Sequence, residues 1–259
     1  MIAAERTGAG TDVVLLHGVG LDRAMWRRCV PALAARHRVT LLDLPGHGGS
    51  APVAPGTGLP DLAAAVAGAL PGPSHVVGFS LGALIAQELA LRSPASVRSL
   101  TLVSAVADRT PEQAAAVRAR LELTRRDPAA TARAAVDRWF DDAWRKAEPE
   151  LAEEVLQTLL ATDRDSYARC YEIFCTADRD LWPRLGGITA PTLAVTGSDD
   201  PGSTPEMSRK IAAAVPGARA VVVPGVRHLL PLQAPGELAA LILEHTRSVD
   251  GERPIPHAS

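Results

Sequence analysis

Short apolar runs rich in β-branched residues recur along the chain, and each ends at a cluster of glycine, proline or polar residues. The runs do not alternate apolar and polar positions, so we expect strands buried on both faces, as in a parallel sheet. The predicted strands are Asp12–Leu16, Arg38–Leu42, His75–Phe79, Ser99–Val103, Thr192–Thr196 and Ala220–Val223. The predicted helices between them are Met25–Arg36, Leu59–Leu70, Leu81–Arg92, Pro205–Val215 and Pro235–Arg247. This alternation predicts an α/β protein with a doubly wound, mostly parallel sheet.

The segment 107–185 breaks the alternation, because it contains no convincing strand. It is rich in alanine, arginine and glutamate, with helix breaks at Asp127-Pro128 and Glu148-Pro149. A segment of this length is too long for a crossover connection, so we predict a helical cap inserted after the fourth predicted strand. Residues 1–106 and 186–247 then form the sheet unit. The tail 248–259 contains two prolines and has little apolar surface to bury, which predicts disorder.

Composition and charge exclude several classes of function. The chain has 259 residues, of which 47% are hydrophobic and 22% charged, and a formal net charge of −2. A nucleic-acid partner requires a basic face, which this balance does not favour. No apolar run approaches the ~18 residues of a membrane helix, and the first ten residues lack the pattern of a secretory signal. Three cysteines, an odd number (Cys29, Cys170 and Cys175), suit a reduced compartment, so we expect a cytoplasmic protein without a nucleic-acid or membrane partner.

The motif Gly78-Phe79-Ser80-Leu81-Gly82 closes the third predicted strand and opens the helix that follows. It has the G-x-S-x-G form of a nucleophile elbow in the strand–turn–helix setting that this motif requires. Glycines on both sides let strand and helix approach closely, while the strained turn presents the hydroxyl above the sheet edge. The pattern predicts Ser80 as a nucleophile; the alternative is a glycine-rich turn that only packs a helix on the sheet.

A serine hydroxyl is inert near neutral pH without a general base, and seven histidines are candidates for that base. His228 is favoured because it follows the last predicted strand, at the same sheet edge as Ser80. His17 is interpreted as a structural residue of the loop after the first strand, and His47 as part of a tight turn. The other histidines lie in a strand, on or beside helices, or in the tail: His37, His75, His245 and His257.

The base needs an acid that fixes its tautomer and stabilises the imidazolium. Two aspartates, Asp199 and Asp200, follow the fifth predicted strand. We favour Asp200 as this acid and keep Asp199 as the alternative. A purely structural role for either aspartate would be to cap the helix that begins at Pro205. An oxyanion hole is expected from two backbone N–H groups, those of Leu81 and Val19.

With these residues in place, the chain resembles the α/β-hydrolase superfamily, within which the order serine, aspartate, histidine is expected. The resemblance covers about Asp12 to Arg247 and rests on the segments LLHGVG, LDLPGHGGS, GFSLG, TGSDDP and PGVRHLLPLQAP. Within the superfamily it is most similar to the 3-oxoadipate enol-lactonase group, through shorter cap motifs that include Arg138-Trp139-Phe140. That similarity implies that the cap roofs the pocket and that Trp139 contacts the substrate.

Three departures from the superfamily pattern stand out. Only about ten residues precede the first predicted strand, so one edge strand of the usual antiparallel hairpin is expected to be missing. The acid loop is one residue longer than usual before Thr204-Pro205, which keeps Asp199 as an alternative. Ala83 replaces the commoner glycine after the Ser-Leu-Gly turn, and this should crowd the start of the helix slightly.

The predicted function is hydrolysis of a small carboxylic ester or lactone, with an enol-lactone as one candidate, through an acyl-enzyme and without cofactor or metal. The predicted partner is a small-molecule substrate; no oligomeric state is predicted. The alternatives are carbon–carbon bond hydrolysis of a vinylogous diketone, a perhydrolase reaction, or a non-hydrolytic ligand-binding or biosynthetic relative that keeps the triad. A dinucleotide-binding protein is rejected, because there is no G-x-G-x-x-G motif.

An acidic substrate would require cations near the pocket. Arg133, Arg138, Arg145 and Lys146 are available in the predicted cap. For each of them we prefer the interpretation of a solvated helix face.

Overall fold

The sheet consists of seven strands, in a computed structural model that describes residues 1–251. The strands are β1 (Ala4–Thr7), β2 (Thr11–Leu16), β3 (His37–Leu42), β4 (Ser74–Phe79), β5 (Val97–Val103), β6 (Thr192–Gly197) and β7 (Arg219–Val223). They are arranged in the order β1-β3-β2-β4-β5-β6-β7. All neighbours pair in parallel except β1, which is antiparallel to β3. The predicted doubly wound, mostly parallel sheet is confirmed.

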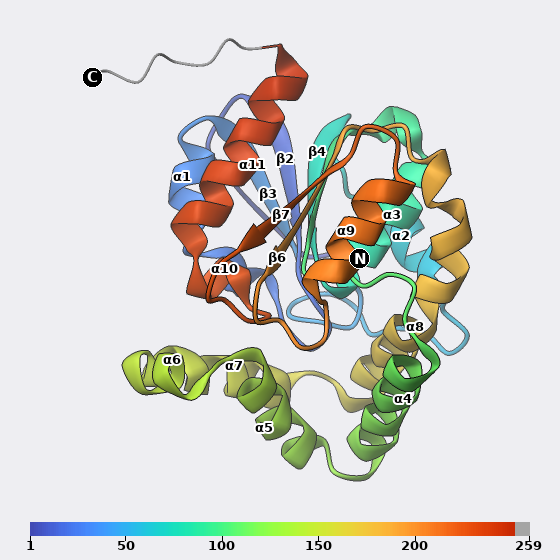
Figure 1. Ribbon diagram of the computed structural model, residues 1–259, viewed down its shortest axis with the longest axis vertical. Helices are drawn as coiled ribbons and strands as arrows, with labels where there is room; N and C mark the ends of the chain where they lie inside the picture. The colour runs from blue at the N-terminus through green and yellow to red at the C-terminus, as the bar shows by residue number, and fades with distance from the viewer. Residues whose placement is uncertain (252–259) are drawn as a thin grey trace.

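Helices cover both faces of this sheet. The α-helices of the described residues are α1 (Val30–Ala34), α2 (Leu59–Ala67), α3 (Leu81–Arg92), α4 (Pro111–Arg126), α5 (Pro128–Trp139), α6 (Asp142–Ala147), α7 (Pro149–Ala161), α8 (Arg164–Leu181), α9 (Pro205–Ala214), α10 (Leu230–Gln233) and α11 (Pro235–Asp250). Short 3-10 helices are η1 (Arg23–Trp26), η2 (Pro94–Ser96) and η3 (Trp182–Gly187). Figure 1 shows α1 and α11 on one face of the sheet and α2, α3 and α9 on the other. No helix within residues 1–251 is long and apolar enough to cross a membrane.

The strand register brings the carboxyl ends of the central strands to one edge of the sheet. Gly78 of β4 lies opposite Leu16 of β2, and Phe79 lies opposite Val103 of β5. On the other side, Gly197 of β6 lies opposite Val223 of β7. The loops that leave these strands therefore meet at this edge, where ligands bind in open parallel sheets.

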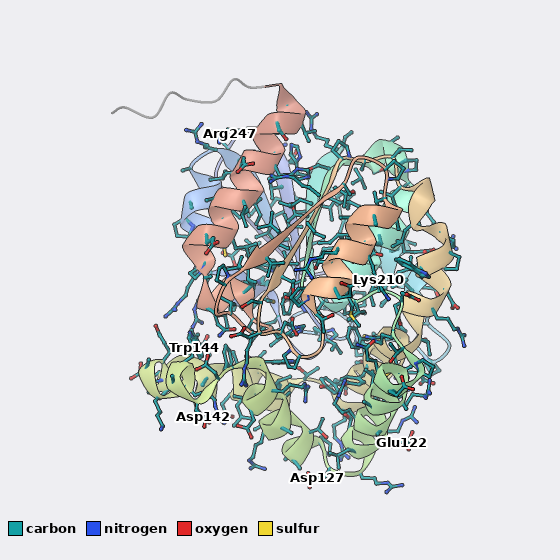
Figure 2. All side chains as sticks on the ribbon, viewed as in Figure 1. Glu122, Asp127, Asp142, Trp144, Lys210 and Arg247 are labelled. Atoms are coloured by element: carbon teal, nitrogen blue, oxygen red, sulfur yellow. The ribbon has the colours of Figure 1, made fainter. Side chains whose placement is uncertain are left out.

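The helices α4 to α8, which we call the cap, lie between β5 and β6 in the chain. In Figure 1, α4 to α7 gather at one end of the sheet, and α8 runs back along its side. The two predicted breaks are confirmed, because Pro128 and Pro149 each begin a helix, α5 and α7. Figure 2 shows charged side chains such as Glu122, Asp127 and Asp142 around the outside of these helices.

The first forty residues match one expectation and contradict another. A single strand precedes β2, since Ala4–Thr7 pairs with β3 over four residues, so one strand of the usual antiparallel hairpin is absent from the described residues, as expected. The predicted helix Met25–Arg36 is broken into η1 and α1, because the chain turns between Arg27 and Cys29 before Pro31 restarts it. Both helices, η1 and α1, are short, and they pack against distant parts of the chain, η1 on α10 and α1 on α11.

The chain end also differs from expectation. Residues 248–250 belong to α11 and not to the predicted tail, because α11 continues to Asp250 and ends at Gly251 in the left-handed conformation. Asp250 accepts a hydrogen bond from Arg98 at 2.6 Å, which attaches the last turn of α11 to the start of β5. The remainder of the predicted tail, 252–259, lies outside the described residues.

Candidate active site

Ser80 lies between the end of β4 and the first turn of α3. Its φ of 52° is left-handed, an uncommon value for a residue with a side chain, and its ψ is −111°. The backbone N–H of Ser80 donates to the carbonyl of Val103 at 2.9 Å, which extends the pairing with β5 into the turn. This strained conformation is the one that a nucleophile elbow requires.

The glycines that flank Ser80 are required by close backbone approaches. A Cβ on Gly78 would lie 2.3 Å from the carbonyl oxygen of Gly82. A Cβ on Gly82 would lie 2.6 Å from the carbonyl oxygens of Leu16 and His17 at the end of β2. The expected crowding by Ala83 has no visible effect on helix length, since α3 runs from Leu81 to Arg92 with Ala83 fully buried.

His228 and Asp200 form a buried pair at the same edge. The Nδ1 of His228 lies 2.7 Å from the Oδ2 of Asp200, and the two side chains are 8% and 0% exposed. The other carboxylate oxygen of Asp200 accepts hydrogen bonds from the backbone N–H groups of Gly202 and Ser203, both at 2.9 Å. Three bonds fix the carboxylate, which in turn orients the imidazole ring.

Asp199 takes a different position from Asp200. It is exposed, and its carboxylate accepts from the hydroxyl of Ser198 at 2.7 Å. Its backbone N–H donates to the carbonyl of Val226 at 3.0 Å, so it helps to hold together the loops after β6 and β7. Of the two acids left open by the sequence, Asp200 is the one that contacts His228.

The loop after β2 packs directly against Ser80. A Cβ on Gly18 would lie 3.2 Å from the Cβ of Ser80 and 2.8 Å from the ring of Phe79, so only glycine permits this approach. Val19, the next residue, is 5% exposed and lines the same cavity as Ser80. The N–H of Leu81 stands at the start of α3, where the first N–H groups of a helix have no intrahelical acceptor. This placement is compatible with the two predicted oxyanion donors.

Two buried histidines, His17 and His47, hold this loop in place; the sequence predicts a structural role in the loop for His17 and a position in a tight turn for His47. The Nε2 of His17 accepts the N–H of Leu44 at 2.8 Å, and the Nε2 of His47 accepts the N–H of Gly20 at 2.9 Å. Burial lowers the pKa of His47 to about 4. Burial, together with the nearby charge of His47, lowers the pKa of His17 well below its usual value. Both rings are therefore neutral near pH 7 and act as acceptors for backbone N–H groups.

Trp139, the last residue of α5, lies beside His228 at this edge of the sheet. Its ring centroid lies 5.7 Å from that of His228, and the ring centroid of Phe79 lies 4.9 Å from that of His228. Trp139 is 7% exposed. The structure therefore brings the tryptophan singled out by the sequence together with Ser80, Asp200 and His228.

One small cavity, of about 40 Å³, is lined by Ser80, Trp139, Asp200 and His228. Its walls combine the sheet-edge residues with cap side chains: Val19, Ser80, Arg109, Val117, Arg120, Arg138, Trp139, Tyr171, Phe174, Asp200, Pro201, Gly202, Ser203 and His228. Arg120, Tyr171 and Phe174 could not be predicted as lining residues, because helical spacing does not say which face of α4 or α8 turns toward Ser80. Arg109 lies in the loop before α4, where no periodic pattern predicts the direction of a side chain.

The cap cations considered from the sequence fall into two groups. Arg138 lines the cavity. Arg133 and Lys146 are exposed, and Arg145 forms ion pairs with Asp137 and Asp142. The solvated interpretation therefore fits three of the four and fails for Arg138.

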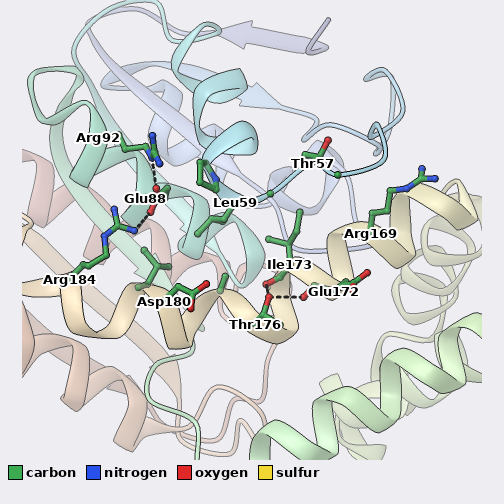
Figure 3. A pocket seen from close by; sticks show the side chains of 15 residues that line it. Thr57, Leu59, Glu88, Arg92, Arg169, Glu172, Ile173, Thr176, Asp180 and Arg184 are labelled. Atoms are coloured by element: carbon green, nitrogen blue, oxygen red, sulfur yellow. Dashed lines mark hydrogen bonds and ion pairs between the residues drawn. The ribbon is translucent and has the colours of Figure 1, made fainter.

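A larger cavity, of about 670 Å³, lies between α8 and the α2–α3 side of the sheet. Figure 3 shows Glu88 there between two arginines, Arg92 and Arg184. Glu88 is buried, and its two oxygens pair with these guanidinium groups, with 2.8 Å to Arg184. None of Ser80, Asp200 and His228 lines this cavity, and its buried charge is already neutralised, so we place the candidate site at the smaller cavity.

Comparison with known proteins gives a family match across most of the chain. Residues 13–241 match the model described as the alpha/beta hydrolase family. A pimeloyl-[acyl-carrier protein] methyl ester esterase of Aeromonas hydrophila is 50% identical over 105 residues, which cover 40% of this chain and only 41% of that enzyme.

Two further relatives match over nearly the full length. An (E)-2-((N-methylformamido)methylene)succinate hydrolase of Acinetobacter baylyi is 29% identical over 232 residues, covering 88% of this chain and 87% of that enzyme. The crystal structure of the enol-lactonase from Burkholderia xenovorans LB400 superposes with a TM-score of 0.87 at 26% identity, over 95% of this chain and 96% of that one.

Proposed function

This chain belongs to the alpha/beta hydrolase family, and from that premise we propose that it is a serine hydrolase that cleaves a small carboxylic ester or lactone. The observation that carries the proposal is the buried contact between His228 and Asp200, beside a left-handed Ser80 at the same cavity. Full-length relatives include a hydrolase of a succinate derivative and an enol-lactonase, which supports a small acyl substrate such as an enol-lactone.

The proposed reaction proceeds in two halves. The Ser80 hydroxyl oxygen attacks the carbonyl carbon while its proton passes to the free ring nitrogen of His228, and Asp200 stabilises the imidazolium. The N–H groups of Val19 and Leu81 stabilise the oxyanion, and the bond to the alcohol oxygen breaks as His228 returns the proton to it. Water then attacks the acyl-enzyme with His228 as base, which releases the acid and restores Ser80. Trp139 is proposed to contact the substrate above His228.

The experiment is the intact mass of the protein after treatment with a fluorophosphonate, beside the variant Ser80→Ala. We expect one adduct on the wild type, none on the variant, and a fall in ester turnover of about 10⁴-fold or more for the variant. A folded wild type that takes no adduct, or a variant that keeps more than about a tenth of the activity, would show that Ser80 is not the nucleophile. Product analysis with lactones, esters and diketones then separates ester cleavage from carbon–carbon cleavage.

A further inference from the structure

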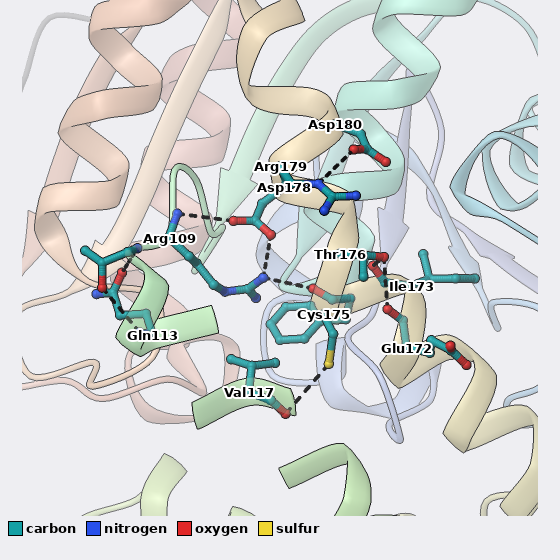
Figure 4. A network of polar contacts seen from close by, with 12 residues as sticks. Arg109, Gln113, Val117, Glu172, Ile173, Cys175, Thr176, Asp178, Arg179 and Asp180 are labelled. Carbon is teal, nitrogen blue, oxygen red and sulfur yellow. Dashed lines mark hydrogen bonds and ion pairs between the residues drawn. The ribbon is translucent and has the colours of Figure 1, made fainter. Parts of the chain in front are cut away.

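Arg109 is a buried cation whose guanidinium is only partly satisfied. Its side chain is 3% exposed, and its Nη1 donates to the carboxylate of Asp178 at 2.6 Å and to the carbonyl of Phe174 at 3.0 Å. Figure 4 shows these bonds, which run from the loop after β5 to helix α8. The Nη2 of Arg109 has no hydrogen-bond partner among the described residues, although it is buried. A buried donor of this kind is costly unless a ligand or water satisfies it.

The same residue lines the cavity that contains Ser80 and His228, and two more arginines line it with Arg109. Arg120 of α4 donates from its Nε to the hydroxyl of Tyr171 at 3.3 Å, and Arg138 of α5 donates to the carbonyl of Ala134 at 3.3 Å. Neither Arg120 nor Arg138 has an ion-pair partner among residues 1–251. Burial lowers the pKa of Arg138, and the charge of Arg120 contributes in the same direction.

The charges around this cavity do not balance. Asp178 neutralises Arg109, and Asp200 is engaged with His228. Neither Arg120 nor Arg138 forms an ion pair among residues 1–251, so three guanidinium groups share the charges of two carboxylates. Like charges gathered in a partly dry site repel each other, and a bound anion would relieve that repulsion.

We propose that Arg109, Arg120 and Arg138 form an anion subsite that binds a carboxylate carried by the substrate, a few bonds from the scissile carbonyl. The proposal rests on the proposed hydrolase function. Guanidinium forks match a planar carboxylate and can bind both of its oxygens.

The first test compares two substrates of nearly equal size, monomethyl glutarate and its neutral amide analogue, methyl 5-amino-5-oxopentanoate. Ester cleavage is followed by proton release at constant pH. We expect wild-type kcat/KM to favour the carboxylate by about a hundredfold, and Arg120→Gln or Arg138→Gln to reduce that preference about tenfold each, in line with charged hydrogen bonds. The matched control is Arg118→Gln, an exposed arginine on the same helix as Arg120, which should keep the wild-type preference.

Arg109 needs a gentler substitution, because loss of its charge would leave Asp178 buried without a partner. Arg109→Lys keeps a positive charge beside Asp178 and removes the free Nη2. We expect Arg109→Lys to reduce the preference for the carboxylate while the melting temperature stays within a few degrees of wild type. An equal preference in Arg109→Lys and wild type would remove Arg109 from the subsite.

A binding measurement keeps the subsite testable apart from catalysis. Calorimetry with monomethyl glutarate on the Ser80→Ala variant should give a Kd about tenfold tighter than that of the amide analogue, and adding Arg120→Gln should remove the difference. Equal binding of the two compounds would overturn the subsite, whether or not the enzyme cleaves them. If the two compounds bind differently but wild type cleaves neither and takes no fluorophosphonate adduct, the proposed hydrolase function fails and the subsite stands.

Discussion

The sheet edge and the cap contribute to one cavity but hold their residues in different ways. At the sheet edge, Ser80, Asp200 and His228 lie in the turn or loop that follows a parallel strand, and backbone hydrogen bonds fix these turns and loops. The cap is held by side-chain contacts, such as the ion pair between Arg109 of the loop after β5 and Asp178 of α8. Positions fixed by the backbone suit bond-making groups, which tolerate little displacement. Positions fixed by side chains suit groups that select the substrate.

The size of the cavity strengthens this contrast. About 40 Å³ holds only a few water molecules, whereas drug-sized ligands occupy sites of about 300 Å³ or more. We expect cap side chains such as Trp139 and Tyr171, which line the cavity, to move aside when a substrate enters. We therefore expect changes in the cap to act on KM and changes at the sheet edge to act on kcat.

The largest effect expected for the sheet edge, short of loss of Ser80 itself, comes from Asp200→Asn. The amide cannot stabilise an imidazolium and favours the wrong tautomer of His228, so kcat should fall by about 10⁴-fold with little change in KM. Steady-state kinetics on an ester substrate measures both.

The neighbouring acid supplies the control. Asp199→Asn changes an exposed carboxylate that contacts Ser198 but not His228, so kcat should stay within about twofold of wild type. Equal losses in the two variants would mean that the aspartates support the loop rather than the imidazole.

The sheet edge was more predictable from the sequence than the cap for a physical reason. Buried parallel strands appear as continuous apolar runs, and the loops that follow the runs lie at the same edge. Ser80, Asp200 and His228 could therefore be placed together. The edge strand β1 was missed because it has only four residues and most of them are exposed. Arg120 could not be distinguished from Arg118, since both lie on one charged helix and only the packing of α4 decides which of them faces the cavity.

The next largest expected effect is a loss of stability, and it arises where the turn around Ser80 packs closely against the end of β2. Gly82→Ala would place a Cβ 2.6 Å from two carbonyl oxygens of the backbone, which no rotamer change can relieve. We expect a loss of about 3 kcal/mol in the free energy of unfolding, or ~6–12 °C in melting temperature. Gly236→Ala on α11 is the control, since its Cβ would meet open space and should leave the melting temperature unchanged or slightly raised. Equal melting temperatures for the two variants would contradict the close approach.

A smaller effect is expected from pH, through the histidines that brace the loop beside Ser80. The pKa of His47 is lowered to about 4 by burial, whereas in the unfolded chain it is about 6.5. Between these pH values the unfolded state binds a proton that the folded state does not. The contribution of His47 to the free energy of unfolding is therefore fully present above about pH 6.5 and is lost as the pH falls toward 4. The slope is about 1.4 kcal/mol per pH unit for one such histidine.

Urea unfolding at pH 7.5 and 5.0 measures this dependence. The variant His47→Gln retains an acceptor for the N–H of Gly20 but cannot titrate, so its stability should fall less between the two pH values than that of wild type. Identical pH dependence in the two proteins would mean that His47 titrates normally in the folded state.

The smallest expected effect concerns the attachment of the cap beside His228. The guanidinium of Arg227 donates to the carbonyls of Asp137 at 3.2 Å and Phe140 at 3.1 Å, and so holds the end of α5 that carries Trp139. Arg227→Met keeps the aliphatic part of the side chain and removes both bonds. We expect KM to rise about three- to fivefold and kcat to stay within twofold, because about 1 kcal/mol of positioning is lost from the cap and none from the turns around Ser80. Arg219→Met, at the opposite end of β7 where Arg219 pairs with Glu244, should change neither constant. If Arg227→Met instead lowers kcat at constant KM, the end of α5 positions His228 itself. The expectation that changes in the cap act on KM and changes at the sheet edge act on kcat would then be wrong for this part of the cap.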